Sequence, residues 1–321
     1  MEAAQTHDDS TTMTAATAAS AVTTVAVVTY NSAQDVERCL AAIYAQLPAG
    51  AEVVVVDNNS ADGTAELVRE RFPQAHLIAN PRNTGFGSAN NQAIRASNGE
   101  YVVLVNPDCE LAPGALDGLV RFMARHPRAA VAGGRLRYAD GSFQHSAFRF
   151  PSLAQVLLDF FPLNWRLAES RWNGRYPRAW DERAFRIDFP LGALMCVRRA
   201  AIDQVGLFDE RFFMYVEEVD WCYRFQRAGW EIWHCPDALA VHHGGRSTRQ
   251  QAAAMFVELH RSRLRFYRKH YSRSFRLAAR ALLTAGALGR AATEWLVDVR
   301  TGGAFPERRA RARACLDVLR L

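Results

Sequence analysis

Three acidic residues stand within one helical turn in the segment from Phe208 to Trp221. Glu217, Glu218 and Asp220 follow directly after an aromatic run. Aromatic and apolar neighbours keep a carboxylate partly dehydrated. Dehydration and like-charge repulsion both raise its pKa, which makes it a stronger base near neutrality. The same acids also suit the first turn of an amphipathic helix, where the macrodipole favours negative charge. The segment alone therefore predicts either a general base or a solvated helix terminus.

Two earlier motifs have the chemistry to hold a nucleotide. Asp57 ends a predicted strand, where a carboxylate can accept the imide N–H of a uracil or thymine ring. The Asn58-Asn59-Ser60 run behind it is also ordinary turn chemistry. The stretch from Asn80 to Asn91 combines two glycines, several amides and an arginine ahead of a helix. Backbone N–H groups at a helix N-terminus suit a phosphate or a ribose.

Two further motifs suit a metal ion and a phosphate. Asp108 follows a buried predicted strand, and a carboxylate there can hold Mg²⁺ or Mn²⁺ against a diphosphate. A simple Pro-Asp turn is the alternative. His242 and His243 follow another strand and precede two glycines and Arg246. One of these histidines can complete the coordination shell of a metal ion, and Arg246 can bind a phosphate.

The elements around these motifs alternate along the first half of the chain. Strands are predicted over residues 22–29, 52–56, 76–79, 101–105 and 129–133, and helices over 35–46, 64–71, 87–96 and 113–126. This alternation predicts an α/β fold with a doubly wound, mostly parallel sheet. Ligands bind such sheets at the carboxyl ends of the strands. The polar motifs fall at those ends, so we expect them to form one site.

The second half has a weaker pattern. Residues 142–185 are rich in aromatic residues, proline and arginine, and we expect an irregular flap over the site. A strand is predicted over residues 187–197, a short helix over 199–206, and a helix over 218–228 that ends at Gly229. Strands over 230–233 and 238–241 and a basic helix over 250–270 follow.

Composition narrows the class of protein. The 321 residues carry a net charge of +6, and arginine is concentrated after residue 246. A basic C-terminal third suits a membrane leaflet or a pyrophosphate, and no segment is typical of a nucleic-acid-binding module. The six scattered cysteines form no metal-binding pair and favour a reducing cytosol. Residues 1–21 lack the pattern of a signal peptide and are expected to be a disordered tail, and no transmembrane helix is predicted.

Taken together, the motifs resemble the inverting family 2 glycosyltransferases with a GT-A fold, especially their bacterial rhamnosyltransferase-like branch. The resemblance covers residues 22–270 and rests on an ordered set of segments. These are Val27 to Ser32, Val56 to Thr64, Asn83 to Asn91, Leu104 to Asp108, Gly192-Ala193, Phe208 to Asp220, and His242 to Ser247.

The resemblance implies a role for each matched residue. Glu218 would be the general base, with Glu217 as its rival and Asp220 nearby, and Asp108 and His242 would bind Mg²⁺ or Mn²⁺, with His243 as the rival of His242. Asn106 stands where the family's Asp-x-Asp motif has its first acid. The acceptor would meet Gly192, Ala193 and Tyr215. The donor would meet Thr29, Tyr30, Asn31, Asp57, Asn59, Asn83, Gly85, Phe86, Asn90, Asn106 and Arg246.

The implied reaction is a single in-line displacement with inversion. The donor would be a dTDP- or UDP-sugar, and the resemblance to the rhamnosyltransferase-like branch favours dTDP-rhamnose. The acceptor would be a hydroxyl group of a lipid-linked or glycan molecule in envelope polysaccharide synthesis. A sugar nucleotidyltransferase would need a glycine-rich Arg-Lys loop after the first strand, where Thr29-Tyr30-Asn31-Ser32 stands. A non-catalytic nucleotide-sugar-binding protein is the other alternative. A glycoside hydrolase would leave the diphosphate features without a use.

Three regions are predicted on this basis. Residues 1–21 form the tail, 22–270 a GT-A domain and 271–321 a basic amphipathic helical extension. The extension is expected to place the protein on the inner face of the plasma membrane, although packing on the protein's own core would use the same apolar stripe. A homo-oligomer is left open. The apolar face would comprise Leu277, Leu282, Leu283, Leu288, Trp295 and Leu296, and the basic face Arg273, Arg276, Arg280 and Arg290.

Overall fold

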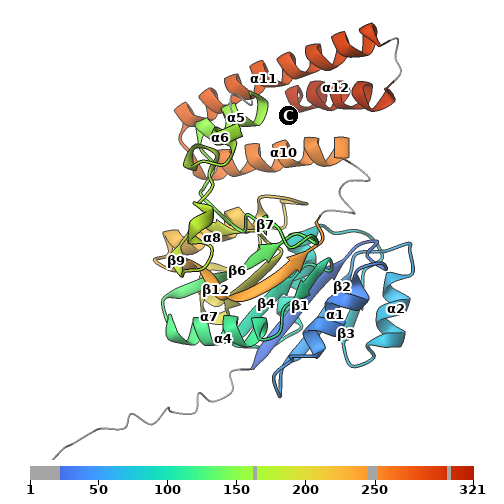
Figure 1. Ribbon diagram of the computed structural model, residues 1–321, viewed down its shortest axis with the longest axis vertical. Coiled ribbons are helices and arrows are strands. Elements are labelled where there is room, and N and C mark those ends of the chain that lie inside the picture. Colours follow the sequence, from blue (N-terminus) through green and yellow to red (C-terminus); the bar gives the residue numbers. More distant parts are fainter. Residues whose placement is uncertain (1–21, 162–164, 245–251, 302–304) are drawn as a thin grey trace, which may run out of the picture.

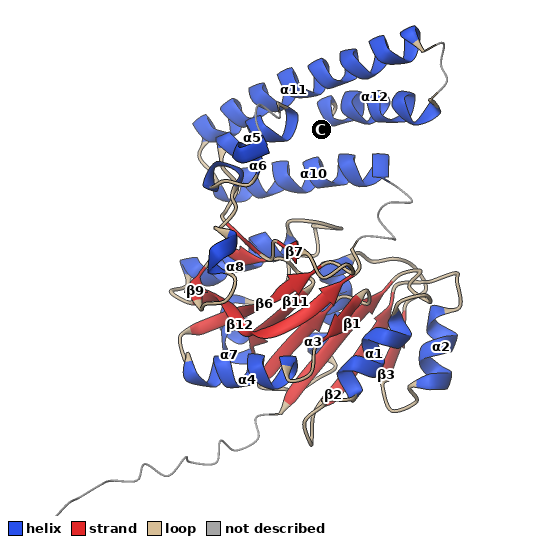
Figure 2. Ribbon diagram, viewed as in Figure 1, coloured by secondary structure: helices blue, strands red, loops and turns tan. Residues whose placement is uncertain are grey.

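A computed structural model describes residues 22–161, 165–244, 252–301 and 305–321. Its centre is one large mixed sheet in the order β3-β2-β1-β4-β11-β6-β12-β5, with β7 and β9 paired at its side (Figure 2). The strands are β1 (Thr23–Thr29), β2 (Glu52–Asp57), β3 (His76–Ala79), β4 (Tyr101–Val105), β5 (Cys109–Leu111), β6 (Ala129–Arg137), β7 (Phe143–Gln144), β9 (Phe185–Arg186), β11 (Leu194–Arg198) and β12 (Glu231–His242). A separate pair is formed by β8 (Ala147–Phe148) and β10 (Phe189–Pro190).

Helices cover both faces of the sheet because the central strands are apolar on both sides. One face packs on α1 (Val36–Tyr44) and α4 (Ala115–Arg125). The opposite face packs on α3 (Phe86–Arg95), α7 (Arg199–Val205) and α8 (Glu217–Arg227). Along β1, Val25 and Val27 face the first layer, and Ala26 and Val28 face the second. Helix α2 (Thr64–Arg71) completes the set beside α1.

The predicted α/β fold is confirmed, and antiparallel strands modify it. Strands β1, β2, β3 and β4 are parallel neighbours, whereas β11 runs antiparallel between β4 and β6. The strand predicted over residues 187–197 is divided into β10 and β11. The two strands predicted between residues 230 and 241 are one continuous strand, β12, with an irregular pairing between Cys235 and Leu239.

The second half ends in a helical part that lies over one edge of the sheet (Figure 1). It consists of α10 (Ala252–His270), α11 (Arg273–Arg300) and α12 (Pro306–Leu319). The region predicted to be an irregular flap contributes a regular helix to it, α5 (Leu153–Phe160), followed by α6 (Trp165–Ala168) and two 3-10 turns (Arg171–Asn173 and Arg178–Trp180). Helix α5 packs closely on α11, because the ring of Phe160 lies directly over Gly286.

The predicted boundary at residue 270 falls in the short turn between α10 and α11, and the division into domains stays a prediction. Residues 1–21 lie outside the described part of the chain. Among the described helices, none combines the length and the apolar character that crossing a membrane requires.

Candidate active site

The carboxyl ends of β1 and β2 are joined by a hydrogen-bond network around Asp57, which is 2% exposed. Its Oδ1 accepts from the hydroxyl groups of Thr29 (2.8 Å) and Ser60 (2.6 Å), and its Oδ2 from the backbone N–H of Ser60 (2.9 Å). A carboxylate offers about four lone-pair positions, so Asp57 can accept one further hydrogen bond. The imide N–H of a nucleobase is a donor of that kind.

Two asparagines shape the loops beside Asp57. Asn31 and Asn59 adopt φ values of 49° and 66°, in the left-handed region that asparagine tolerates better than most residues. The side-chain oxygen of Asn31 accepts from the backbone N–H of Ala61 (2.8 Å), which links the loop after β1 to the loop after β2. Tyr30 is partly exposed and Asn59 exposed, so both predicted ligand contacts lie at the surface of these loops.

Asn58, which was expected only to form a turn, organises the next loop. Its side-chain oxygen accepts from the side chains of Asn80 (3.0 Å) and Thr84 (3.1 Å), and its amide nitrogen donates to the carbonyl oxygen of Gly85 (3.2 Å). Asn83, a predicted ligand residue, accepts from the backbone N–H of Gly85 (2.9 Å). The loop ahead of α3 is therefore held by β2.

Gly85 is the point where this loop meets the segment that precedes the acidic helix. Its φ is +87°, and a Cβ there would lie 2.3 Å from the carbonyl oxygen of Phe213. That oxygen accepts from the backbone N–H of Phe86 (3.0 Å). Only glycine combines this conformation with this close approach. The position of Gly85 thus connects two motifs that are far apart in the chain.

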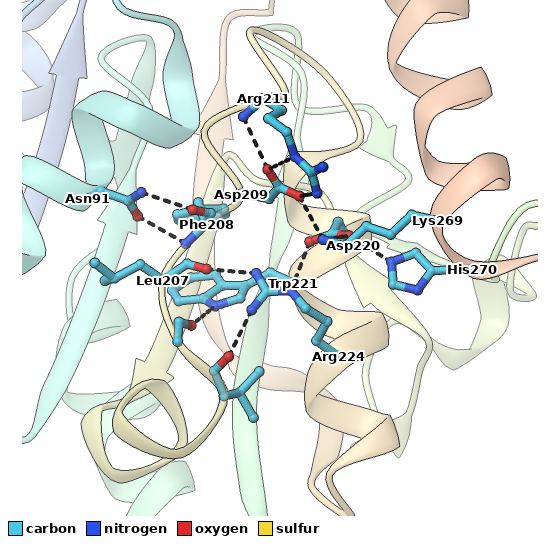
Figure 3. A network of polar contacts seen from close by, with 12 residues as sticks. Asn91, Leu207, Phe208, Asp209, Arg211, Asp220, Trp221, Arg224, Lys269 and His270 are labelled. Atoms are coloured by element: carbon cyan, nitrogen blue, oxygen red, sulfur yellow. Dashed lines mark hydrogen bonds and ion pairs between the residues drawn. The ribbon is translucent and has the colours of Figure 1, made fainter.

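Two neighbouring asparagines of α3 serve the same junction. Asn90 is buried and donates to the carbonyl oxygen of Phe86 (3.0 Å) in its own helix, so we assign it a positioning role rather than the ligand contact that was predicted. Asn91 was not predicted. It exchanges hydrogen bonds of 3.0 Å with the backbone of Phe208 and contacts Glu210 (2.9 Å). Asn91 therefore anchors the start of the acidic segment on α3 (Figure 3).

Asp108 and His242 form the predicted metal pair. The antiparallel pairing of β5 with β12 brings them together, and His242 Nε2 lies 3.3 Å from Asp108 Oδ1. The side-chain amide of Gln144, a residue that no sequence motif predicted, contacts His242 Nδ1 at 3.0–3.2 Å. With the amide oxygen accepting from Nδ1–H, Nε2 turns its lone pair toward Asp108, as a metal ligand requires. His243 instead faces Glu110, with 3.8 Å between its Nε2 and the carboxylate.

The donor set at this pair fits Mg²⁺ or Mn²⁺. The potential ligand atoms of Asp108, Cys109 and His242 lie within 4.8 Å of one another. Burial raises the pKa of Cys109 well above its usual range, and its thiol donates to the carbonyl oxygen of Ala193 (3.4 Å). Because this thiol is already engaged by the carbonyl oxygen, the carboxylate of Asp108 and the imidazole of His242 are the groups that would hold the ion, and a carboxylate suits Mg²⁺ and Mn²⁺.

Residues Gly192 and Ala193 lie between the metal pair and the acidic helix. The carbonyl oxygen of Ala193 accepts from the backbone N–H of Asn106 (2.9 Å), in the loop that carries Asp108. On the other side, a Cβ at Gly192 would lie 3.9 Å from Cγ of Glu218 and 3.8 Å from the ring of Phe86. The structure thus brings together predicted site residues from the β4, β11, α3 and α8 segments.

The two glutamates that open α8 differ in environment. Glu218 is partly exposed beside Gly192, and desolvation raises its pKa from the ordinary value of 4.5 to about 7. Glu217 is buried, and its pKa is raised well above 4.5 by desolvation first and by the charges of Glu218 and Glu258 next. Within the described residues Glu217 Oε2 has no hydrogen-bond partner. Glu218 is therefore the better placed of the two to take a proton from a ligand near neutrality.

Asp220, the third predicted acid, is fully buried and is surrounded by three basic side chains (Figure 3). It accepts from Arg224 (2.8 Å) of its own helix, and from Lys269 and His270 (2.7 Å each) of α10. Burial acts to raise the pKa of Asp220, but the hydrogen bonds from His270 and Lys269 outweigh it, so the pKa is lowered. These contacts give Asp220 no access to a substrate, and we assign it a positioning role in place of the predicted catalytic one.

The backbone ahead of α8 is strained. Tyr215 and Val216 have φ values of 66° and 68°, which are uncommon for any residue except glycine and especially rare for the β-branched Val216. Contacts on both sides hold it: the Phe213 carbonyl meets α3, and the Met214 carbonyl accepts from Ser262 of α10 (2.9 Å). Strain of this kind gathers at functional sites. The predicted acceptor residue Tyr215 lies in this turn, whereas Arg246 lies outside the described residues.

Comparison of the sequence with known families and proteins agrees with this arrangement. The sequence model of "Glycosyl transferase family 2" matches residues 24–206. The N-acetylglucosaminyl-diphospho-decaprenol L-rhamnosyltransferase of Mycobacterium tuberculosis is 34% identical over 266 residues, which cover 77% of this chain and 84% of that protein. The low-salt glycan biosynthesis hexosyltransferase Agl10 of Haloferax volcanii is 26% identical and covers 68% of this chain and 66% of its own.

Solved structures share the fold. The mannosyltransferase PcManGT from Pyrobaculum calidifontis, in complex with GDP-Man and Mn²⁺, superposes with a TM-score of 0.55 at 20% identity, over 92% of this chain and 85% of its own. GalNAc-T7 with UDP, GalNAc and Mn²⁺ gives a TM-score of 0.52 at 16% identity, over 69% of this chain and 43% of its own. At these identities the likeness concerns the fold, which is that of the GT-A glycosyltransferases.

Proposed function

The chain belongs to glycosyl transferase family 2, in its rhamnosyltransferase-like branch, and from this premise we propose that it moves L-rhamnose from dTDP-rhamnose to a hydroxyl of a lipid-linked acceptor, with inversion. The observation that carries the proposal is the place of Gly192 and Ala193. Ala193 is hydrogen-bonded to the loop of the metal pair on one side, and Gly192 lies beside Glu218 on the other. A donor diphosphate held at Asp108 would thus have its sugar directed toward a base.

The proposed reaction needs one proton transfer and one displacement. Glu218 takes the proton of the acceptor hydroxyl. The oxygen of that hydroxyl forms a bond to the anomeric carbon while the bond from that carbon to the diphosphate oxygen breaks. The electron pair leaves with the nucleoside diphosphate, and the configuration at the anomeric carbon inverts. Because the pKa of Glu218 is about 7, the residue can accept this proton at neutral pH and release it to water afterwards.

The chain's own residues would prepare both partners. Asp57, Thr29 and Asn31 are proposed to hold the nucleoside at the ends of β1 and β2. Asp108 and His242 are proposed to hold Mg²⁺ or Mn²⁺, which when bound neutralises charge on the diphosphate leaving group. Gly192, Ala193 and Tyr215 are proposed to face the acceptor, next to the ring of Phe86.

The choice of rhamnose and of a lipid-linked acceptor follows the Mycobacterium tuberculosis relative. Its name describes transfer of L-rhamnose to N-acetylglucosaminyl-diphospho-decaprenol, and this chain spans 84% of it. Asp57 supports the nucleotide, because thymine and uracil carry an imide N–H, which a carboxylate can accept. An acceptor of this kind resides in a membrane, so we propose that the protein works as a peripheral protein on the inner face of the plasma membrane.

A panel of nucleotide sugars tests the proposal. The melting temperature of the protein is measured with dTDP-rhamnose, UDP-, GDP- and other dTDP-sugars, each with and without Mn²⁺. A ligand that binds the native state raises it by mass action. We expect the largest rise with dTDP-rhamnose and Mn²⁺, and none for Asp108→Asn. A larger rise with a GDP-sugar would refute the assignment of the nucleotide, and binding without any release of nucleoside diphosphate would favour a non-catalytic binding protein.

A further inference from the structure

Helix α11 has two apolar faces. Its inward face packs on α5 and α12 through Ala279, Leu283 and Ala287. Leu282, which the sequence placed on a membrane-facing stripe together with Leu283, packs on this core as well. At 100° per residue, the opposite face exposes a second stripe. It consists of Leu277, Leu288, Trp295, Leu296 and Val299, with exposed fractions between 48% and 64%.

The helical part also holds the positive charge of the protein. Residues 252–321 contain 15 Lys and Arg and five Asp and Glu, a net charge of +10, although the whole chain has only +6. Much of this charge is neutralised locally, as in the pairs of Glu294 with Arg308 and Arg311. Six arginines of α11 and α12 have no ion pair with any described residue. Arg280 donates to the carbonyl oxygen of Leu319, and Arg290 lies over the ring of Phe256. The others are Arg273 and Arg300, which flank the exposed stripe, Arg276, and Arg313 on α12.

A hollow of about 300 Å³ lies between α11 and α12 and continues the stripe. Trp295 and Leu316, which are 60% and 46% exposed, provide apolar walls, and Arg313 contributes a cation. The other charged lining residues form ion pairs with one another, Glu294 with Arg308, Asp298 with Arg309, and Asp317 with Arg320. Apolar side chains bordered by unpaired arginines suit the boundary between acyl chains and anionic headgroups, where tryptophan is also favoured. Anionic lipids would supply the missing counter-charges.

We propose that this face, the α11 surface, docks the protein on an anionic membrane leaflet. The α11 surface comprises the exposed stripe together with Arg273, Arg300 and Arg313. The carboxyl ends of β1, β2 and β4 point toward the helical part (Figure 1), so a leaflet on this surface lies on the same side of the sheet as the active site. The inference rests on the proposed lipid-linked acceptor for its purpose, but the binding itself is tested without that acceptor.

The test is flotation of the full-length protein with vesicles of phosphatidylglycerol and phosphatidylcholine, against vesicles of phosphatidylcholine alone. We expect binding only to the anionic vesicles, and release at about 0.5 M NaCl, because salt screens surface charge. The variants Leu288→Ser/Leu296→Ser and Arg273→Gln/Arg300→Gln/Arg313→Gln should each lose at least about 5-fold in bound fraction. Tyr138→Ser and Arg69→Gln replace exposed residues of the sheet domain and serve as matched controls that keep binding.

Two further readouts separate the outcomes. Donor-induced rise in melting temperature should be unchanged in all these variants, since none of the residues contacts the active site. If the donor does not raise the melting temperature of the wild-type protein, the proposed function is refuted, but the flotation result still tests membrane docking. Wild-type protein that stays unbound at low salt would overturn the docking proposal. So would a wild-type dimer in light scattering that becomes monomeric in Leu288→Ser/Leu296→Ser without any vesicle binding, because a second copy of the chain would then cover the stripe.

Discussion

The two halves of the active site are stabilised in different ways. The nucleotide half, around Asp57 and Asn58, is held by hydrogen bonds among loops of the first 91 residues. The base half, from Phe208 to Asp220, is strained and charged, and it is held by residues of α3 and α10. The first half carries its own support, whereas the second depends on a helix that begins more than 30 residues later. We therefore expect substitutions in the two halves to separate donor binding from turnover.

The largest separation should come from the two carboxylates that are proposed to act directly. Glu218→Gln keeps the shape of the side chain and removes its basicity, so turnover should fall by roughly 10²- to 10⁴-fold while donor affinity persists. Asp57→Ala should do the reverse and weaken the donor first. The measurements are initial rates and donor titration on each variant. If Glu217→Gln is the inactive variant and Glu218→Gln is active, the base has been assigned to the wrong residue.

The dependence of the base half on α10 can be broken at Asp220. Asp220→Asn removes the buried carboxylate that pairs with Arg224, Lys269 and His270, of which only Lys269 keeps a second acidic partner, Asp209. Breaking such a buried pair costs about 3 kcal/mol of unfolding free energy. Denaturant unfolding measures this loss. The pH profile of the residual turnover should shift as well, because Glu218 lies only two residues before Asp220 in the same helix. Glu37→Gln, at an exposed ion pair with Arg71 on the other face of the sheet, is the control and should cost less than about 1 kcal/mol. An equal loss of unfolding free energy in both variants would contradict the proposal that α10 stabilises the base half through Asp220.

The junction between the halves is Gly85. Gly85→Ala puts a methyl group 2.3 Å from the Phe213 carbonyl and imposes a positive φ on alanine, which together should cost about 2 kcal/mol or more. Turnover and donor binding should both fall, since both loops must shift. Gly50→Ala is a matched control, with a positive φ and open space around its Cα. Similar losses in both variants would show that backbone conformation alone, and not the contact with Phe213, makes glycine necessary.

A smaller effect is expected on how the unfolding free energy depends on pH. Glu218 in the folded protein keeps its proton up to about pH 7, whereas the unfolded residue loses it near 4.5. The folded state therefore binds more protons in that window, and stability falls as the pH rises through it. Glu218→Gln removes this cost. Because solvent reaches the partly exposed side chain and weakens the effect, the variant should stabilise the protein by about 1–2 kcal/mol at pH 8, but not below pH 4.5. A stabilisation that is equal at both pH values would refute the raised pKa.

The difference between the halves also explains what the sequence could predict. The sheet, the strand-end motifs and the pair of Asp108 with His242 could be predicted, because parallel strands bring their carboxyl ends to one edge. The support of the base half could not. Asn91 differs from Asn90 only in the direction it faces, and Lys269 and His270 look like part of a basic helix until α10 is placed over Asp220. Helix α5 was also missed, because its short apolar pattern lies within an aromatic, proline-rich region.

The most direct test of the central claim is the stereochemistry of a metal-dependent transfer. Purified protein is given dTDP-rhamnose, Mn²⁺ and a soluble analogue of a lipid-linked N-acetylglucosamine acceptor, and the product is analysed by NMR. We predict a single rhamnoside whose anomeric configuration is opposite to that of the donor, formed by the wild type and lost in Glu218→Gln and Asp108→Asn. A product with the donor's configuration, or equal activity of Glu218→Gln, would contradict the direct displacement that the site is proposed to perform.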